Sequence, residues 1–198
     1  MKVTVISATE RPMDVISLAA GICYGKSDVS EKRVRHCFKS GHMSVFEHAS
    51  ITFRVEGISR ACMAQLTRHR LVSFCVESQR YNKYDLSGDE WYVMPPAFEK
   101  NANWKVSFRT SMEYARSEYL CALEYGFKPE DARYLLPEAT KTNLIMTCNV
   151  RQLFHIFDMR MDKAAQWEVR NLASELFLAA SGLSDQWRCI MDLYGGKE

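Results

Sequence analysis

Three segments of the chain have the residue pattern of β-strands. Two of them alternate apolar and polar residues, which is typical of a strand with one buried face, and the third is rich in β-branched residues. The predicted strands cover residues 2–7, 51–55 and 143–147. Residues 71–78 fit neither a strand nor a helix, so we expect an irregular loop there.

Helical spacing of apolar residues covers more of the chain than the strand patterns do. It predicts helices over residues 14–20, 30–40, 59–68, 101–125, 150–159 and 163–181, with a further short helix opened by Pro129. Asp14 and Ser30 stand where N-cap residues are expected. Within the longest helix, Trp104, Phe108 and Tyr119 fall on one stripe, which indicates a core or a subunit interface.

The order of these elements predicts the fold class. Helices are mixed with a few strands that do not alternate regularly with them, so we expect an α+β fold rather than a doubly wound parallel sheet. The prediction is a single domain over residues 1–198, with a small mixed or antiparallel sheet packed by several helices. Neither G-x-G-x-x-G nor a P-loop occurs, so nucleotide binding of the Rossmann type is not expected.

Composition narrows the function classes. The formal net charge is +2, which is too small for a general nucleic-acid binder, and no stretch is long and apolar enough for a signal peptide or a membrane helix. The seven cysteines are odd in number and form no C-x-x-C, which favours reduced thiols over a disulfide framework. We therefore expect a cytoplasmic protein with neither nucleic-acid nor membrane partners.

Candidate chemistry is concentrated between residues 68 and 80, where three arginines and one histidine occur. Guanidinium groups bind phosphate oxygens well, and neighbouring arginines repel one another unless anions lie between them. Only Glu77 is close in sequence. Two interpretations stay open from this pattern alone: a phosphate site, or a solvated basic face that is salt-bridged to distant carboxylates.

These residues also carry a resemblance to a known family. Arg68, His69 and Arg70, followed after seven residues by Ser78, match the signature of flavin-dependent thymidylate synthases. The segments 41–48 and 165–168 also resemble that family, and the resemblance extends roughly over residues 22–173. It implies a homotetramer with FAD at the subunit interfaces.

The resemblance assigns two groups of residues. FAD is expected to contact His42, Ser44, Arg68, His69, Arg70, Asn149 and His155. The substrate dUMP is expected to contact Gln65, Arg68, Ser78, Gln79, Arg80, Arg133 and Arg160. No metal is expected, because Cys37, His42 and His48 do not have a familiar zinc-binding spacing.

Roles follow from the chemistry of these groups. Arg80 and Arg133 are expected to clamp the phosphate, and Arg160 to favour negative charge on the uracil ring. For Arg133 and Arg160, ion pairing with Asp131 and Asp158 is the alternative. Ser78 and Arg160 form the predicted catalytic pair, although Ser78 lacks a dedicated general base and suits nucleotide binding better than nucleophilic attack.

The implied reaction transfers a methylene group from methylenetetrahydrofolate to dUMP, and reduced FAD, regenerated by NADPH, supplies the hydride. Flavin-dependent hydroxymethylation of a pyrimidine nucleotide is an alternative within the same chemistry. A nucleic-acid-binding module that uses the Arg-rich segment is the alternative of another class.

Two positions depart from the family pattern. Many relatives have Asn where this chain has Cys75, and Glu or Gln where it has Val76. Val76 cannot supply a polar contact, so Glu77 or the backbone is expected to compensate. Cys75 is interpreted as a small, semi-buried filler rather than a nucleophile.

Overall fold

The computed structural model describes residues 1–81, 86 and 91–196. The contacts between residues divide the chain into two compact units. The first unit comprises Met1–Glu56, Leu66–Cys75 and Ile145–Glu198, and the second comprises Gly57–Gln65 and Val76–Leu144.

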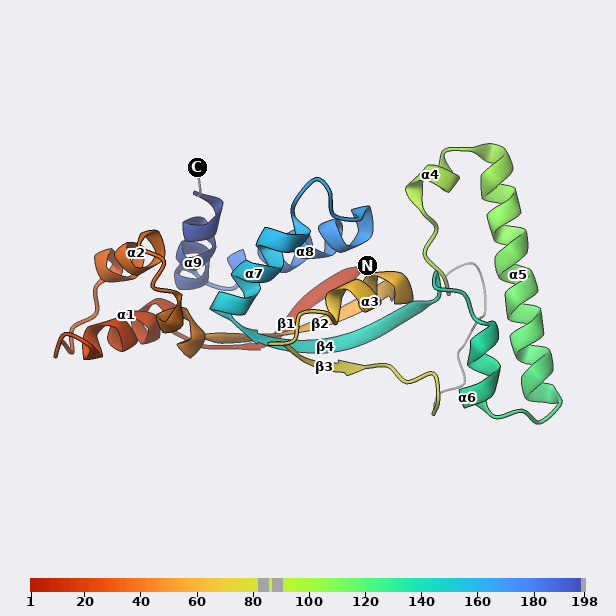
Figure 1. Ribbon diagram of the computed structural model, residues 1–198, viewed down its shortest axis with the longest axis horizontal. Helices are drawn as coiled ribbons and strands as arrows, with labels where there is room; N and C mark the ends of the chain where they lie inside the picture. Colours follow the sequence, from red (N-terminus) through yellow and green to blue (C-terminus); the bar gives the residue numbers. More distant parts are fainter. Residues whose placement is uncertain (82–85, 87–90, 197–198) are drawn as a thin grey trace. The chain divides into compact units, whose positions relative to one another are not determined.

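The described strands form one four-stranded sheet in the order β1-β2-β4-β3 (Figure 1). Their bounds are β1 (Lys2–Ala8), β2 (Ser50–Ser59), β3 (Ser73–Val76) and β4 (Lys141–Asn149). The sheet is antiparallel, and β1 pairs with β2 from Lys2↔Glu56 to Ala8↔Ile51 with a register shift between Val5 and Ser7. This confirms the predicted α+β class and all three predicted strands.

The segment 71–78 was wrongly predicted to be irregular, because β3 lies within it. Four residues are too few to show an alternating pattern reliably, and β3 is an edge strand whose side chains are exposed or half-buried. Pairing with the sheet, rather than local sequence, makes this segment a strand.

In the first unit, helices pack together with buried aromatic and aliphatic side chains. Its helices are α1 (Pro12–Ile22), α2 (Glu31–Lys39), the 3₁₀ helix η1 (Met43–His48), α7 (Val150–Arg160), α8 (Trp167–Ser181) and α9 (Asp185–Gly195). Phe154 of α7 stacks on Tyr194 of α9 with ring centroids 5.5 Å apart. Burial of such rings contributes strongly to a core. Helix α9 was not predicted, although Ser184 caps it by accepting from the backbone N–H of Trp187.

Two predicted caps differ from the structure. Helix α1 begins at Pro12, with Arg11 in the N-cap position, so Asp14 lies inside the first turn. Proline suits that first turn because it has no N–H to leave unpaired. Ser30 does occupy the N-cap position of α2, but its side chain makes no capping hydrogen bond.

In the second unit, the long helix α5 (Ala102–Glu124) contributes Met112 and Tyr119 to a hydrophobic cluster with Trp91, Tyr92 and other residues. The remaining helices are α4 (Pro96–Glu99), α6 (Pro129–Ala132) and the 3₁₀ helix η3 (Arg133–Leu135), while α3 (Arg60–Leu66) begins in this unit. Figure 1 shows α6 beside the lower half of α5.

The predicted stripe on α5 is only partly a core. Tyr119 is fully buried and Phe108 packs against the cluster, whereas Trp104 is 56% exposed and stacks on Phe98. None of the described helices is long and apolar enough to cross a membrane.

Candidate functional site

The three side chains of segment 68–70, in the first unit, differ in their exposure to solvent. His69 is 5% exposed, whereas Arg68 and Arg70 are exposed. The backbone N–H of His69 donates to the carbonyl of Leu66 over 3.2 Å, which turns the chain at the end of α3. Among the residues that the structure describes, no carboxylate forms an ion pair with Arg68 or Arg70.

His69 and Arg160 contact each other directly. Nε of Arg160 donates a hydrogen bond to Nε2 of His69 over 3.0 Å, so the imidazole accepts at Nε2 and is neutral with its proton on Nδ1. Burial, the positive charge of Arg160 and the neighbouring His155 together lower the pKa of His69 to about 4. The contact joins a predicted FAD residue to a predicted uracil residue 91 positions later in the chain.

His155 lies against the same pair. Its ring centroid is 5.5 Å from that of His69, in an edge-to-face arrangement. His155 is exposed, and it lines a cavity of about 740 Å³ in the first unit. The size is within the range of small-molecule and cofactor sites.

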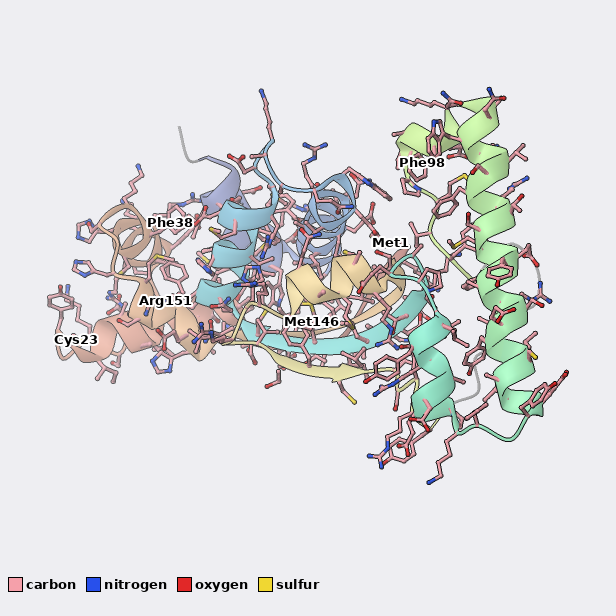
Figure 2. All side chains as sticks on the ribbon, turned by 45° about the vertical axis from the view of Figure 1, so that its right-hand side comes forward. Met1, Cys23, Phe38, Phe98, Met146 and Arg151 are labelled. Carbon is pink, nitrogen blue, oxygen red and sulfur yellow. The ribbon has the colours of Figure 1, made fainter. Side chains whose placement is uncertain are left out.

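The polar wall of this cavity comes largely from one face of α7. Arg151, His155 and Asp158 are spaced i, i+4 and i+7, so they share one side of the helix, and all three line the cavity. Arg151, which is labelled in Figure 2, forms an ion pair with Glu47. Lys39 adds a second cation.

Asp158 on the cavity wall is contacted by Tyr194 of α9. The Tyr194 hydroxyl hydrogen-bonds to the Asp158 carboxylate, and burial together with that carboxylate raises the pKa of Tyr194 above its ordinary value. A neutral tyrosine donor therefore orients the carboxylate on the cavity wall over the whole physiological pH range.

The remaining predicted FAD residues are also in the first unit. His42 and Ser44 are exposed at the start of η1, next to Gly41 and Met43 of the cavity wall. Asn149 is the N-cap of α7, and its Oδ1 accepts from the backbone N–H of Gln152 over 2.8 Å. Its amide nitrogen remains the group that can donate to a ligand.

A second cavity, of about 370 Å³, lies in the second unit. Two predicted dUMP residues, Gln79 and Arg133, line it, together with Arg60, Tyr134 and Glu138 among others. Arg133 is oriented by donating from Nε to the carbonyl of Glu130 over 3.0 Å, and its guanidinium carbon is 5.9 Å from the centroid of the Tyr134 ring. Gln65, another predicted dUMP residue, is half-buried on α3.

Arg80 and Ser78 are arranged by local contacts in the same unit. The backbone N–H of Arg80 donates to Oγ of Ser78 over 3.1 Å, so the hydroxyl stabilises a turn. Nε of Arg80 pairs with the Glu130 carboxylate, and its guanidinium carbon lies 5.2 Å from the centroid of the Tyr81 ring. In this structure Arg80 is therefore paired with a carboxylate 50 positions away in the sequence.

One expectation about the departures from the family pattern needs correction. Cys75 is exposed rather than semi-buried, because it points outward from the edge strand β3. The Glu77 carboxylate accepts from Nδ2 of Asn143 over 2.9 Å, and the Glu77 backbone pairs with Asn143 and Arg60. Glu77 thus links the end of β3 to β4 through side-chain and backbone contacts.

Several residues of both cavities were missed in the sequence. Arg151 lies on the predicted helix 150–159, and its i, i+4 spacing with His155 was the available signal. Lys39, Arg60 and Tyr194 had no local signal, because only the packing of separate elements brings them to a cavity or against one of its side chains. Asp158 was named in the sequence only as the alternative ion-pair partner of Arg160. Among the described residues, no group of His, Cys, Asp and Glu could hold a metal ion.

The first-unit cavity fits a cofactor such as FAD on its own chemistry. Lys39 and Arg151 are cations suited to a diphosphate, and the half-buried Phe38 offers apolar ring surface. The exposed Arg68 and Arg70 add further phosphate donors in the same unit.

Comparisons with known proteins agree on one family. The family model described as "Thymidylate synthase complementing protein" matches residues 4–181. The flavin-dependent thymidylate synthase of Haloarcula marismortui is 36% identical, with 91% of each chain covered. That of Pyrococcus furiosus is 37% identical over 87% of this chain and 76% of its own length.

Solved structures agree as well. The Helicobacter pylori enzyme ThyX, complexed with FAD and dUMP, is 26% identical, covers 98% of this chain and 99% of its own, and superimposes with a TM-score of 0.77. The UMP/dUMP methylase PolB of Streptomyces cacaoi, bound with 5-Br dUMP, is 25% identical, covers 98% and 94%, and has a TM-score of 0.83.

Proposed function

Because the chain belongs to the flavin-dependent thymidylate synthase family, we propose that it converts dUMP to dTMP with methylenetetrahydrofolate as carbon donor and FAD, reduced by NADPH, as hydride carrier. The observation that carries this proposal is the contact between Arg160 and the neutral, buried His69 of the family signature. A basic surface that only neutralises acidic side chains has no need of such an arrangement.

We assign the nucleotide phosphate to the second unit. Gln79 and Arg133 line its cavity, and Arg80 follows directly after Gln79. Two guanidinium groups match a dianionic phosphate in charge and geometry. Gln65 and Ser78 complete the proposed dUMP set in this unit, and the family resemblance also assigns Arg68 and Arg160 to dUMP.

Arg160 is assigned to the uracil. Its Nε is fixed by His69, so the plane of the guanidinium is set before substrate binds. A fixed positive charge beside a uracil carbonyl stabilises negative charge on the ring and so raises the nucleophilicity of carbon 5. Neutral His69 suits this role, because an imidazolium there would repel Arg160.

Ser78 is assigned to binding rather than attack. Its hydroxyl oxygen accepts from the backbone N–H of Arg80, which supports a structural and nucleotide-binding role. A serine nucleophile requires a base that removes its proton, and none of the described residues donates or accepts at this hydroxyl in that way.

The FAD residues are His42, Ser44, Arg68, His69, Arg70, Asn149 and His155, to which we add Arg151 and Lys39 of the cavity wall. FAD held by these residues would supply the hydride-transfer chemistry between NADPH and the methylene-bearing nucleotide. The protein binds and orients the reactants and stabilises charge.

The proposal extends to the organisation of the enzyme. The matched family model spans residues from both units, which supports a single functional domain over residues 1–198. We propose a cytoplasmic homotetramer with FAD at its subunit interfaces, as the resemblance implies, and folate as a further ligand. Flavin-dependent hydroxymethylation remains the second reaction to exclude, while a nucleic-acid-binding module has no support from the relatives.

The test is a spectrum followed by a product analysis. The purified protein should be yellow, release FAD on heating, and bleach when NADPH is added. With dUMP and methylenetetrahydrofolate it should form dTMP, identified by mass, rather than the hydroxymethyl nucleotide. A colourless protein that takes up no added FAD would refute the proposal.

A further inference from the structure

Glu130 contacts both arginines that are assigned to the nucleotide phosphate. Its carboxylate forms an ion pair with Nε of Arg80, and its backbone carbonyl accepts from Nε of Arg133 over 3.0 Å. The other carboxylate oxygen lies 4.0 Å from Nζ of Lys128. The Glu130 carboxylate therefore has two cationic neighbours, Arg80 and Lys128, while its backbone carbonyl orients Arg133.

The two arginines differ in their position relative to the second-unit cavity. Arg133 lines the second-unit cavity, whereas Arg80 is not among the described residues that line it. Arg80 is instead engaged by Glu130 and packed over Tyr81. Its side chain is 56% exposed and that of Glu130 is 32% exposed, so both can reorient without disturbing a core.

We infer that Glu130 competes with the phosphate of dUMP for Arg80, so that nucleotide binding exchanges a carboxylate for a phosphate at this guanidinium. The inference rests on the proposed assignment of Arg80 to the phosphate. It adds Glu130 as a residue that sets the affinity of the site and favours dianionic over weakly charged ligands.

The energetics permit such an exchange. An ion pair between partly exposed side chains is weak, because solvent screens it and both side chains lose freedom. A phosphate dianion brings a larger charge and more acceptor oxygens, so it wins against a single carboxylate. A ligand with one negative charge interacts less favourably with Arg80, so it displaces Glu130 less readily and binds more weakly than a dianion.

The experiment measures dUMP binding by calorimetry in the FAD-loaded protein, comparing Glu130→Gln with wild type. Glutamine keeps the size of the side chain and removes its charge. We expect dUMP to bind roughly two- to fivefold more tightly, the range that a surface ion pair is worth, with a smaller gain at high salt. Asp131→Asn is the matched control, because it makes the same charge change one residue away on α6.

A double-mutant cycle with Arg80→Ala separates competition for Arg80 from general repulsion of the phosphate. The gain from Glu130→Gln should largely vanish when Arg80 is absent. Three results would overturn the inference. Glu130→Gln could raise the dUMP affinity equally with and without Arg80, Asp131→Asn could raise it as much as Glu130→Gln does, or Glu130→Gln could leave it unchanged. A wild-type protein that takes up FAD but binds no dUMP overturns the phosphate assignment itself, and this result is distinct from the others.

Discussion

Nε of Arg160 and Nε2 of His69 are joined by a hydrogen bond of 3.0 Å, which couples the protonation state of a buried histidine to the orientation of an arginine. The histidine can accept this bond only while Nε2 is unprotonated. Its pKa of about 4 keeps it neutral throughout the physiological range. The pair is therefore held in one arrangement at the pH where the enzyme works.

The depressed pKa of His69 predicts a loss of stability in acid. Between pH 6.5 and 4 the unfolded chain binds a proton at this residue and the folded chain does not, so the free energy of unfolding falls as the pH is lowered through this window. The loss should approach about 3 kcal/mol and level off below pH 4.

Urea unfolding of wild type and His69→Gln at pH 7 and pH 4.5 tests whether His69 causes the predicted loss of stability in acid. Glutamine keeps an acceptor for Arg160 but does not titrate, so the variant should lose less stability on acidification. Equal losses in both proteins would show that other groups are responsible.

Arg80→Ala should weaken dUMP binding strongly, on the order of tenfold or more, because a charge-assisted contact to phosphate is lost. FAD should stay bound, because the proposed FAD residues and the first-unit cavity belong to the other unit. Calorimetry with dUMP and the flavin absorbance at a fixed protein concentration provide the two readouts. A variant that binds dUMP normally would reject the phosphate assignment of Arg80.

Ser78→Ala should retain measurable synthase activity with a raised KM for dUMP. The hydroxyl accepts from the backbone N–H of Arg80, so its loss loosens the turn that carries this arginine but removes no nucleophile. Steady-state kinetics of dTMP formation separate the two interpretations. Complete loss of turnover with unchanged dUMP affinity would instead support a nucleophilic serine.

Asn149 has a structural and a proposed ligand-binding function, and two substitutions separate them. Asn149→Ala removes the cap of α7 and should cost about 1 kcal/mol of stability as well as FAD affinity. Asn149→Asp keeps the capping oxygen, so it should retain stability but lose FAD affinity, because it has no amide donor and adds negative charge near a phosphate-bearing cofactor.

Thermal unfolding of the apoprotein and FAD titration by absorbance give the two measurements for this pair of variants. If Asn149→Asp binds FAD as well as wild type does, Asn149 is only a helix cap.

Local sequence was sufficient for the elements that have a strong period or a strong cap. The alternation at Ile51, Phe53 and Val55 predicted β2, and the three residues are fully or almost fully buried. The spacing in α5 predicted a helix whose bounds differ from the expected ones by one residue at each end. These signals are carried by neighbours in the chain, so no tertiary information is needed to read them.

The shortest strand and the orientation of individual side chains could not be predicted from local sequence and required the tertiary structure. Four residues of β3 become a strand because the sheet offers an edge, and Cys75 is exposed for the same reason. The stripe on α5 was predicted to be a core or a subunit interface, and only the tertiary structure shows that Tyr119 is core whereas Trp104 is 56% exposed.

The sequence by itself determined the family, the fold class and the set of candidate residues, because the Arg-His-Arg…Ser signature and the hydrophobic periods are local in the chain. The tertiary structure decided which charges meet. Arg160 reaches His69 and Glu130 reaches Arg80 across 91 and 50 positions respectively. Such contacts depend on how separate elements pack, and Coulomb and hydrogen-bond energies fall off with distance in space rather than with separation in sequence.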